Sequence, residues 1–355
     1  MHLEVAVYLH IPFCDSKCGY CAFNSKTNKN HLKEEYMQAL SKDLQNKLLD
    51  FSISKVTSLY IGGGTPSVVK SQQYHNIFNI LEPYFIQDIE INIEANPNSL
   101  SLEWIGDLKQ MGVNRLSLGV QSFFTDKLRF LERNHRVDSV FESIDNATKV
   151  GLENLSIDLI YGTPFCNQNL LNQEIQIASK LPINHISAYQ LSIDEGSRFS
   201  IQKKQEFSGE FAGFASMGHF VREELRQAGF LQYEVSNYSR GYQSRHNLAY
   251  WEQKDYLGVG AGGVGCIAGV RSYGVCEIEE YLKETEYTQE ILSQRDLDLE
   301  HLFLGFRSCV GVLEDKITKK KELEILLKEK KVEKKAERIY AKDYFLGDEL
   351  ALFLW

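Results

Sequence analysis

Three cysteines lie close together near the start of the chain, in the stretch HIPFCDSKCGYC at residues 10–21. Cys14, Cys18 and Cys21 are separated by three and then two residues. A structural zinc site needs four protein ligands, usually as two pairs that are distant in sequence. No second pair is present. The other cysteines stand singly and are better explained as small core residues or idle thiols than as ligands: Cys166, Cys266, Cys276 and Cys309.

Three close thiolates suit a four-iron four-sulfur cluster instead. Each cysteine then holds one iron, and the fourth iron stays open. An open iron can be chelated by a ligand that carries an amine and a carboxylate side by side. S-adenosylmethionine offers such a pair, and a cluster of low reduction potential can push one electron into its carbon–sulfur bond and release a carbon radical. We therefore expect a cluster and this cofactor at the cysteine loop.

The composition is typical of a folded protein of the cytosol. The 355 residues, 43% of them hydrophobic, can bury a large core. Seven unevenly spaced cysteines argue against a secreted disulfide framework and for reduced thiols. The first residues do not resemble a signal peptide, and no run approaches the ~18 to 20 apolar residues that cross a bilayer. A net charge of −9 disfavours nonspecific binding to nucleic acid or acidic lipid. We expect a cytoplasmic protein.

The cysteines must be positioned by a repeating pattern of strands and helices. Residues 31–51 repeat apolar side chains every three or four positions and predict an amphipathic helix. Six such strand-then-helix units predict a parallel sheet with right-handed crossovers, either an open doubly wound sheet or a barrel. The expected strands are short runs rich in apolar, β-branched residues: 5–11, 56–62, 89–95, 115–121, 155–161 and 185–191.

The placement of unusual residues favours the barrel. The cysteines follow the first expected strand, and the stretch GGGTPS at 62–67 follows the second. Glu94 and Gln121 end the third and fourth strands, and Asp158 lies inside the fifth. Residues from five consecutive strands converge more readily at the mouth of a closed or nearly closed barrel than on a flat sheet. We therefore predict a partial (β/α)6 barrel.

The pattern changes after about residue 235. Residues 236–284 are rich in Gly, Tyr and polar side chains and predict a connecting segment dominated by loops. Residues 285–355 predict a small, mostly helical C-terminal domain. Its Lys/Glu-dense stretch at 314–342 has charges that alternate over helical distances, which favours a solvated helix face over a binding tail.

Eight stretches that span nearly the whole chain carry a further signal: YLHIPFCDSKCGYCAF, LYIGGGTPS, NIEANPNSL, RLSLGVQSF, LERNHR, SIDLIYGTP, YQLSIDEGSRF and SRHNLAYW. In this order they resemble radical S-adenosylmethionine proteins, and within them the branch of oxygen-independent coproporphyrinogen III oxidases and HemW-type haem chaperones. The resemblance implies a radical S-adenosylmethionine core over residues 1–235, a four-iron four-sulfur cluster on Cys14, Cys18 and Cys21, and a HemN-type domain over 285–355.

The resemblance also implies which residues hold S-adenosylmethionine. The glycine stretch would let the backbone approach the methionine part closely, and the polar side chains would bind its amino, carboxylate and ribose groups. For the glycine stretch, the alternative is a plain tight turn. For the polar side chains, the alternative is an internal ion pair, such as Arg133 with one of the acids. His10 is either a core residue or a residue adjacent to the cluster. The implied contacts are Tyr8, Gly63, Gly64, Thr65, Glu94, Gln121, Arg133 and Asp158.

Two features favour the chaperone side of the branch. Phe23 stands where the porphyrinogen-oxidising members carry a further cysteine, and the signature H-N-x-x-Y-W stands at residues 246–251. The signature implies haem contacts by His246, Asn247, Tyr250 and Trp251, with the imidazole as a ligand of the iron and the aromatic rings against the macrocycle. A packed loop with a hydrogen-bonded His246 is the alternative. One departure is Val264, which stands where relatives commonly have histidine.

Two functions follow from these resemblances. The first is a haem chaperone that passes haem to an apo-haemoprotein, and the second is oxidative decarboxylation of coproporphyrinogen III. As partners we expect haem and an apo-haemoprotein acceptor, and neither nucleic acid nor stable membrane insertion. Transient contact with a membrane and a homodimer both stay open.

Overall fold

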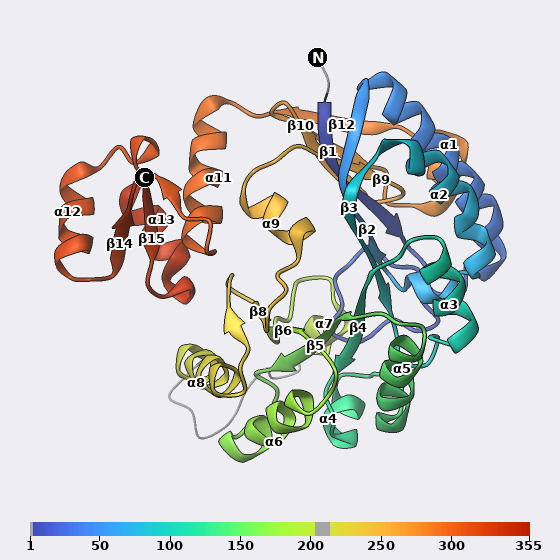
Figure 1. Ribbon diagram of the computed structural model, residues 1–355, viewed down its shortest axis with the longest axis horizontal. Helices are drawn as coiled ribbons and strands as arrows, with labels where there is room; N and C mark the ends of the chain where they lie inside the picture. Colours follow the sequence, from blue (N-terminus) through green and yellow to red (C-terminus); the bar gives the residue numbers. More distant parts are fainter. Residues whose placement is uncertain (1–2, 203–213) are drawn as a thin grey trace.

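The computed structural model describes residues 3–202 and 214–355, and a large curved sheet is its central feature (Figure 1). Six parallel strands follow one another in sequence order, so the predicted parallel core of a partial barrel is confirmed. These strands are β1 (Leu3–Ile11), β2 (Ile53–Gly63), β3 (Phe85–Ala95), β4 (Arg115–Gln121), β5 (Asn154–Tyr161) and β6 (His185–Gln190).

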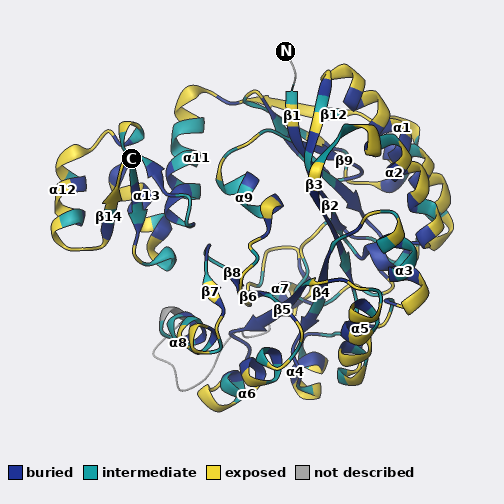
Figure 2. Cartoon of the chain, viewed as in Figure 1, coloured by how far each residue is buried: buried dark blue, intermediate teal, exposed yellow. Residues whose placement is uncertain are grey.

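Helices cover the outer face of this sheet (Figure 1). The strands are buried on both faces, as expected of parallel strands with crossover helices, and the helices bury one side only (Figure 2). The helices that follow the first six strands are α1 (Lys33–Asp50), α2 (His75–Leu81), α3 (Leu102–Gln110), α4 (Thr125–Phe130), α5 (Val137–Lys149), α6 (Gln168–Ser179), α7 (Arg198–Ile201) and α8 (Phe214–Gln227).

The segment expected to be loops forms strands that extend the sheet. β9 (Tyr256–Val259) pairs in parallel with β1. In the described part of the chain the strands form one 12-stranded sheet, which is open because β12 and β7 are its two edges. Glycine explains the wrong expectation, because a Cβ on Gly258 would overlap the Val264 carbonyl, so these glycines permit close strand approach. The added elements are β7 (Leu231–Gln232), β8 (Asn237–Ser239), α9 (Arg245–Trp251), β10 (Val264–Ile267), β11 (Val270–Gly274), α10 (Ile278–Lys283) and β12 (Tyr287–Ile291).

The C-terminal part has a hydrophobic core of its own, which begins with residues of α11. Ser293 caps this helix, and a three-stranded antiparallel sheet completes the unit. We call residues 293–355 the C-terminal unit; the expected boundary at residue 285 stays a prediction. Its elements are α11 (Gln294–Phe306), β13 (Val312–Leu313), α12 (Lys320–Lys328), β14 (Val332–Lys335), β15 (Arg338–Ala341) and α13 (Gly347–Leu354).

The charged stretch at 314–342 is only partly helical. Helix α12 ends at Lys328, and Lys330 adopts a positive φ of 58° that reverses the chain. The following residues form the hairpin of β14 and β15. Within the described ranges, no helix combines the length and the apolar character that spanning a bilayer requires.

Candidate functional site

Two neighbouring cavities contain almost all the chemically unusual residues. One, of about 390 Å³, lies at the carboxyl ends of the six parallel strands; we call it the three-thiol cavity, because Cys14, Cys18 and Cys21 line it. The other, of about 1000 Å³, lies between β9 to β11, α9 and the C-terminal unit; we call it the large cavity. Phe23, Tyr60 and Asn247 line both cavities.

The cysteine loop is held in place at both of its ends. The Lys26 amide donates to the Pro12 carbonyl at 2.7 Å, and the Cys14 amide donates to the Lys26 carbonyl at 3.0 Å. Farther along the loop, the amide of Phe199 in α7 donates to the Gly19 carbonyl at 2.9 Å. These backbone hydrogen bonds give the loop a defined shape.

Burial disfavours the ionised form of two of the thiols, Cys14 and Cys21. Burial raises the pKa of Cys14, and hydrogen bonds from Thr65 and Ser25 offset part of that rise. Burial also raises the pKa of Cys21. A metal bound at these sulfurs would have to displace their protons, which is the usual linkage at cysteine metal sites.

The three sulfurs are not arranged around a single ion. In the described part of the chain, no set of three or more His, Cys, Asp or Glu side chains is arranged as a site for one metal ion. In a four-iron four-sulfur cluster each thiolate binds a different iron, so the donors surround a cube and do not converge. The donor set therefore fits a cluster by its chemistry.

Arg133 connects the cysteine loop to the strands. Its Nη1 donates to the Cys18 sulfur at 3.2 Å, and its Nη2 donates to Asn96 and to the Gly119 carbonyl, both at 2.7 Å. The guanidinium thus donates to neutral groups and a thiol, and not to an acid as in the alternative of an internal ion pair. Its Nε is buried without a hydrogen-bond partner among the described residues, and so can serve a bound ligand.

The glycine stretch after β2 forms a cradle without side chains. Gly63 has a φ of 114°, and a Cβ there would lie 2.6 Å from the His10 ring. A Cβ on Gly64 would lie 2.6 Å from the Phe13 carbonyl oxygen. Thr65 is buried, and its hydroxyl lies 3.3 Å from the Cys14 sulfur. Only glycine therefore fits at positions 63 and 64, where the backbone packs closely against His10 and Phe13.

Two carboxyls lie deeper in the three-thiol cavity. Burial raises the pKa of Asp158 to about 7, and the charge of Glu94 adds to the effect. Burial also raises the pKa of Glu94, although the Tyr60 hydroxyl donates to it at 2.7 Å and the Gly63 amide at 3.2 Å. Two acids with raised pKa values in one cavity are typical of a functional site, and they can bind cationic or hydroxyl-bearing groups of a ligand.

The remaining expected contacts separate between the two cavities. Gln121 lines the three-thiol cavity with a positive φ of 67°, a strained conformation for a non-glycine residue. Tyr8 lines the large cavity, with its hydroxyl 3.0 Å from His10 Nδ1. His10 also lines the large cavity, where its ring is buried and its Nε2 is hydrogen-bonded to the Asn24 carbonyl.

Sequence reasoning missed several residues of the three-thiol cavity. Tyr60 and Asn96 lie inside the quoted stretches LYIGGGTPS and NIEANPNSL, so their place in these stretches was a usable signal. Arg115 gave none, because it starts a strand and lies far from the strand's carboxyl end in sequence. It is 2% exposed and donates to Asn92 at 2.8 Å and to Ser117 at 3.0 Å.

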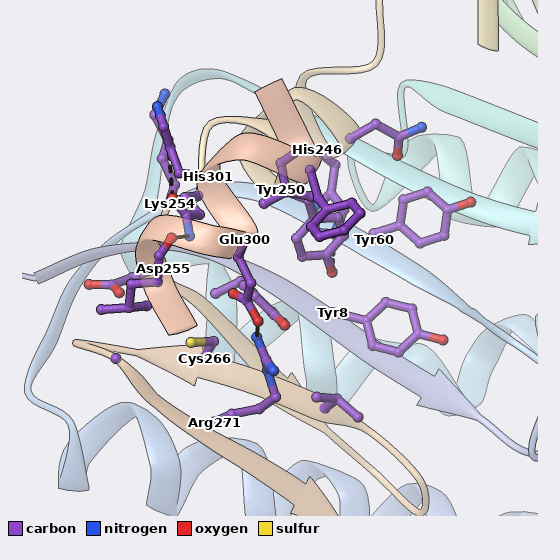
Figure 3. Close-up of a pocket in the computed structure, with 18 of the residues that line it drawn as sticks. Tyr8, Tyr60, His246, Tyr250, Lys254, Asp255, Cys266, Arg271, Glu300 and His301 are labelled. Atoms are coloured by element: carbon purple, nitrogen blue, oxygen red, sulfur yellow. Dashed lines mark hydrogen bonds and ion pairs between the residues drawn. The ribbon is translucent and has the colours of Figure 1, made fainter. Parts of the chain in front are cut away.

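The large cavity was not expected from the sequence. Its wall combines four tyrosines and several apolar residues with many polar and charged side chains (Figure 3). Tyr60 stacks against His246 with ring centroids 5.1 Å apart, and Tyr250 meets the same imidazole at 4.8 Å. Its volume lies at the upper end of the range for small-molecule sites, and it therefore has room for a large flat ligand.

His246 is in the first turn of α9 and is 1% exposed. Its Nδ1 is hydrogen-bonded to the Ser58 hydroxyl at 2.8 Å, and its Nε2 to the Tyr250 hydroxyl at 3.0 Å. Burial lowers its pKa to about 4, so the imidazole is neutral near pH 7. Haem ligation by His246 stays a prediction, and it requires one of these two hydrogen bonds to open.

The other residues that the sequence singled out for haem or for the chaperone branch differ in whether they line a cavity. Asn247 and Tyr250 line the large cavity, whereas Trp251 is half-buried at the end of α9 and is absent from both walls. Phe23 is 71% exposed at the junction of the cavities. Val264 lines the large cavity, so the position that commonly carries histidine faces this space.

The comparisons with known proteins agree with this arrangement. Residues 8–169 match the Radical SAM superfamily model. Heme chaperone HemW of Lactococcus lactis is 33% identical, with 89% of this chain and 84% of that protein covered. Heme chaperone HemW of Bacillus subtilis is also 33% identical, with 89% and 86% covered.

A solved structure has the same fold over almost the whole chain. It is the coproporphyrinogen III oxidase HemN of Escherichia coli, described as a radical SAM enzyme, with a TM-score of 0.83 and 20% identity. The match covers 99% of this chain and 90% of that one. Given the two HemW relatives and the superfamily match, the chain belongs to the HemW family of radical S-adenosylmethionine proteins.

Proposed function

We propose that this protein is a haem chaperone that binds haem in the large cavity and delivers it to an apo-haemoprotein. The observation that carries the proposal is the aromatic cavity of about 1000 Å³ directly beside the three-thiol cavity. Two relatives bear the name heme chaperone. A macrocycle needs apolar surface for both faces and a donor for its iron, and the tyrosines and His246 at this wall offer both.

The three-thiol cavity serves a four-iron four-sulfur cluster and S-adenosylmethionine in this proposal. Cys14, Cys18 and Cys21 hold the iron, and a bound cluster supplies electrons at low potential. Arg133 donates a hydrogen bond to the Cys18 sulfur and so orients the loop. Its partnerless Nε, together with Asp158, binds polar groups of the cofactor. Thiolate ligands must stay reduced, so we place the protein in the cytoplasm.

Anaerobic reconstitution tests both parts of the proposal. We expect iron and sulfide in the wild type and stable haem uptake without decarboxylation of coproporphyrinogen III. The variant Cys21→Ala should lose the iron and sulfide. Its matched control is Cys309→Ala, at a half-buried cysteine that lines neither cavity, and it should keep them.

Three results would contradict the proposal. Zinc in place of iron and sulfide would exclude the cluster. Release of carbon dioxide from coproporphyrinogen III would favour the enzyme of the same branch. A wild-type protein that binds no haem at micromolar concentration would exclude the chaperone.

A further inference from the structure

An ion pair crosses the wall of the large cavity and joins two parts of the molecule. Arg271 on β11 bonds through Nη2 to the carboxylate of Glu300 on α11, and both residues line the cavity (Figure 3). The two side chains are 22% and 32% exposed. The pair thus ties the main sheet to the C-terminal unit at the cavity's edge.

Arg271 differs from the other cations at this wall. Lys316 pairs with Asp298 inside the C-terminal unit at 2.8 Å, and Lys254 pairs with Glu252 two residues away. Arg271 alone of these three bridges the two parts, and its planar fork can hold a carboxylate through two parallel hydrogen bonds. A further carboxylate, Glu290, lies 3.9 Å from Nη1 and does not line the cavity.

We propose that Arg271 binds a carboxylate of the ligand in the large cavity, and that Glu300 is the internal competitor for the same guanidinium. This inference rests on the proposed function, in which the ligand is haem. Haem carries two propionate groups on one edge of its macrocycle, and one of them would be the carboxylate that Arg271 binds. A propionate that reaches Arg271 brings a second negative charge beside Glu300, which repels it. The ion pair then opens, and the ligand's carboxylate takes the place of Glu300 on the Arg271 guanidinium.

Haemin and haemin dimethyl ester separate this role from general packing, because the ester keeps the macrocycle and lacks free carboxylates. In absorbance titrations, Arg271→Gln should bind haemin ~10-fold more weakly, since a charge-assisted hydrogen bond is lost. Glu300→Gln should bind haemin ~5-fold more tightly, because the competitor is gone. Neither change should alter the binding of the ester.

Glu290→Gln is the matched control, since it removes the other carboxylate near Arg271 from outside the cavity. Its haemin affinity should stay within about twofold of the wild type. Arg271→Lys keeps the charge without the fork and should fall between the wild type and Arg271→Gln. Thermal melts of every variant show whether the fold is retained.

The outcomes separate the two proposals. If the wild type binds neither compound, the proposed function fails. If the wild type binds haemin but Arg271→Gln and Arg271→Lys bind it equally well, only the role of Arg271 fails. Equal losses for haemin and its ester would assign Arg271 to packing, and an unchanged affinity in Glu300→Gln would exclude the competition.

Discussion

At the scale of single residues, Tyr60 is the side chain that connects the two cavities. Its hydroxyl donates to Glu94 in the three-thiol cavity, and its ring stacks against His246 at the large one. A cofactor that displaces the Glu94 contact would therefore disturb the packing of His246. The two sites share a wall one aromatic residue thick, which offers a physical basis for coupling between them.

Haem ligation by His246 can be tested by removing the Tyr250 hydroxyl, which is hydrogen-bonded to its Nε2. The variant Tyr250→Phe removes this partner, so a haem iron would no longer compete with it. We expect Tyr250→Phe to bind haem as tightly as the wild type or up to ~5-fold more tightly. His246→Ala should bind at least ~10-fold more weakly, with iron and sulfide content unchanged.

Tyr256→Phe is the control for that pair, because its ring contacts Tyr250 at 4.6 Å and it also lines the large cavity. Its haem affinity should follow the wild type. Unchanged haem binding in His246→Ala would move the iron ligand to another residue.

Asp158 predicts a pH dependence of stability in the protein without cofactors. Its pKa is raised to about 7 from 3.8, so the folded state keeps a proton that the unfolded chain releases above pH ~4. This residue's contribution is therefore fully present below pH ~4, falls as the pH rises, and is lost above pH ~7. Asp158→Asn removes the effect and should gain up to roughly 4 kcal/mol relative to the wild type by pH 8.

Urea unfolding at pH 5 and pH 8 measures this difference. The gain should be larger at pH 8 than at pH 5. Asp194→Asn, at an exposed carboxyl on the rim of the same cavity, is the control and should show no such trend. A gain of equal size at both pH values would mean that Asp158 is not the protonated group.

At the scale of elements, a buried carboxylate holds the start of α9. Glu90 on β3 accepts hydrogen bonds from the amides of Arg245 and His246, at 2.9 and 2.8 Å, and from the Tyr242 hydroxyl at 2.8 Å. Burial alone would raise its pKa, but Arg115 and these amides lower the pKa below the ordinary value. Glu90 thus provides the negative charge that a helix N-terminus favours, from a distant strand.

Glu90→Gln should destabilise the protein and displace His246. Losing the charge at the two amides should lower the free energy of unfolding by about 2 kcal/mol. Haem affinity should fall with it, while iron and sulfide content stays unchanged. Asp88→Asn is the control on the same strand, because that side chain is exposed, and it should change stability by less than about 0.5 kcal/mol. Equal stability of Glu90→Gln and the wild type would contradict the capping role.

The elements differ in how well the sequence predicted them. The six parallel strands were predicted because each is an apolar, β-branched run with a helix after it. β9 and β10 were missed because glycines such as Gly258 and Gly265 are typical of loops, and only the tertiary structure shows that strands pack closely there. The turn at Lys330 was missed because a positive φ on lysine leaves no mark in the sequence.

At the scale of the whole molecule, the three-thiol cavity was largely predictable and the large cavity was not. Parallel strands bring their carboxyl ends together, so residues after consecutive strands meet whatever their distance in sequence. The large cavity depends on how α11 lies against β11 and α9, which is a matter of packing between units. No local pattern encodes that contact, and Arg271 and Glu300 therefore carried no signal in the sequence.

This difference in construction predicts that the two ligands stabilise different parts of the molecule. The three-thiol cavity is lined only by residues between Cys14 and Asn247, whereas the wall of the large cavity includes residues of α11. Haem at a hundred times its dissociation constant should stabilise the site by about 2.7 kcal/mol. Amide hydrogen exchange should therefore slow by up to ~100-fold in both β9 and α11, because opening either one destroys the haem site.

S-adenosylmethionine, added to reconstituted protein, is the internal control for this measurement. It should slow exchange at the carboxyl ends of the six parallel strands and leave α11 unchanged. Haem protection confined to the strands would place haem outside the large cavity. A bound group directly stabilises only the walls that it touches, and S-adenosylmethionine should not touch α11. Equal protection of α11 by both ligands would therefore mean that the C-terminal unit responds to any ligand, and not to contact with haem.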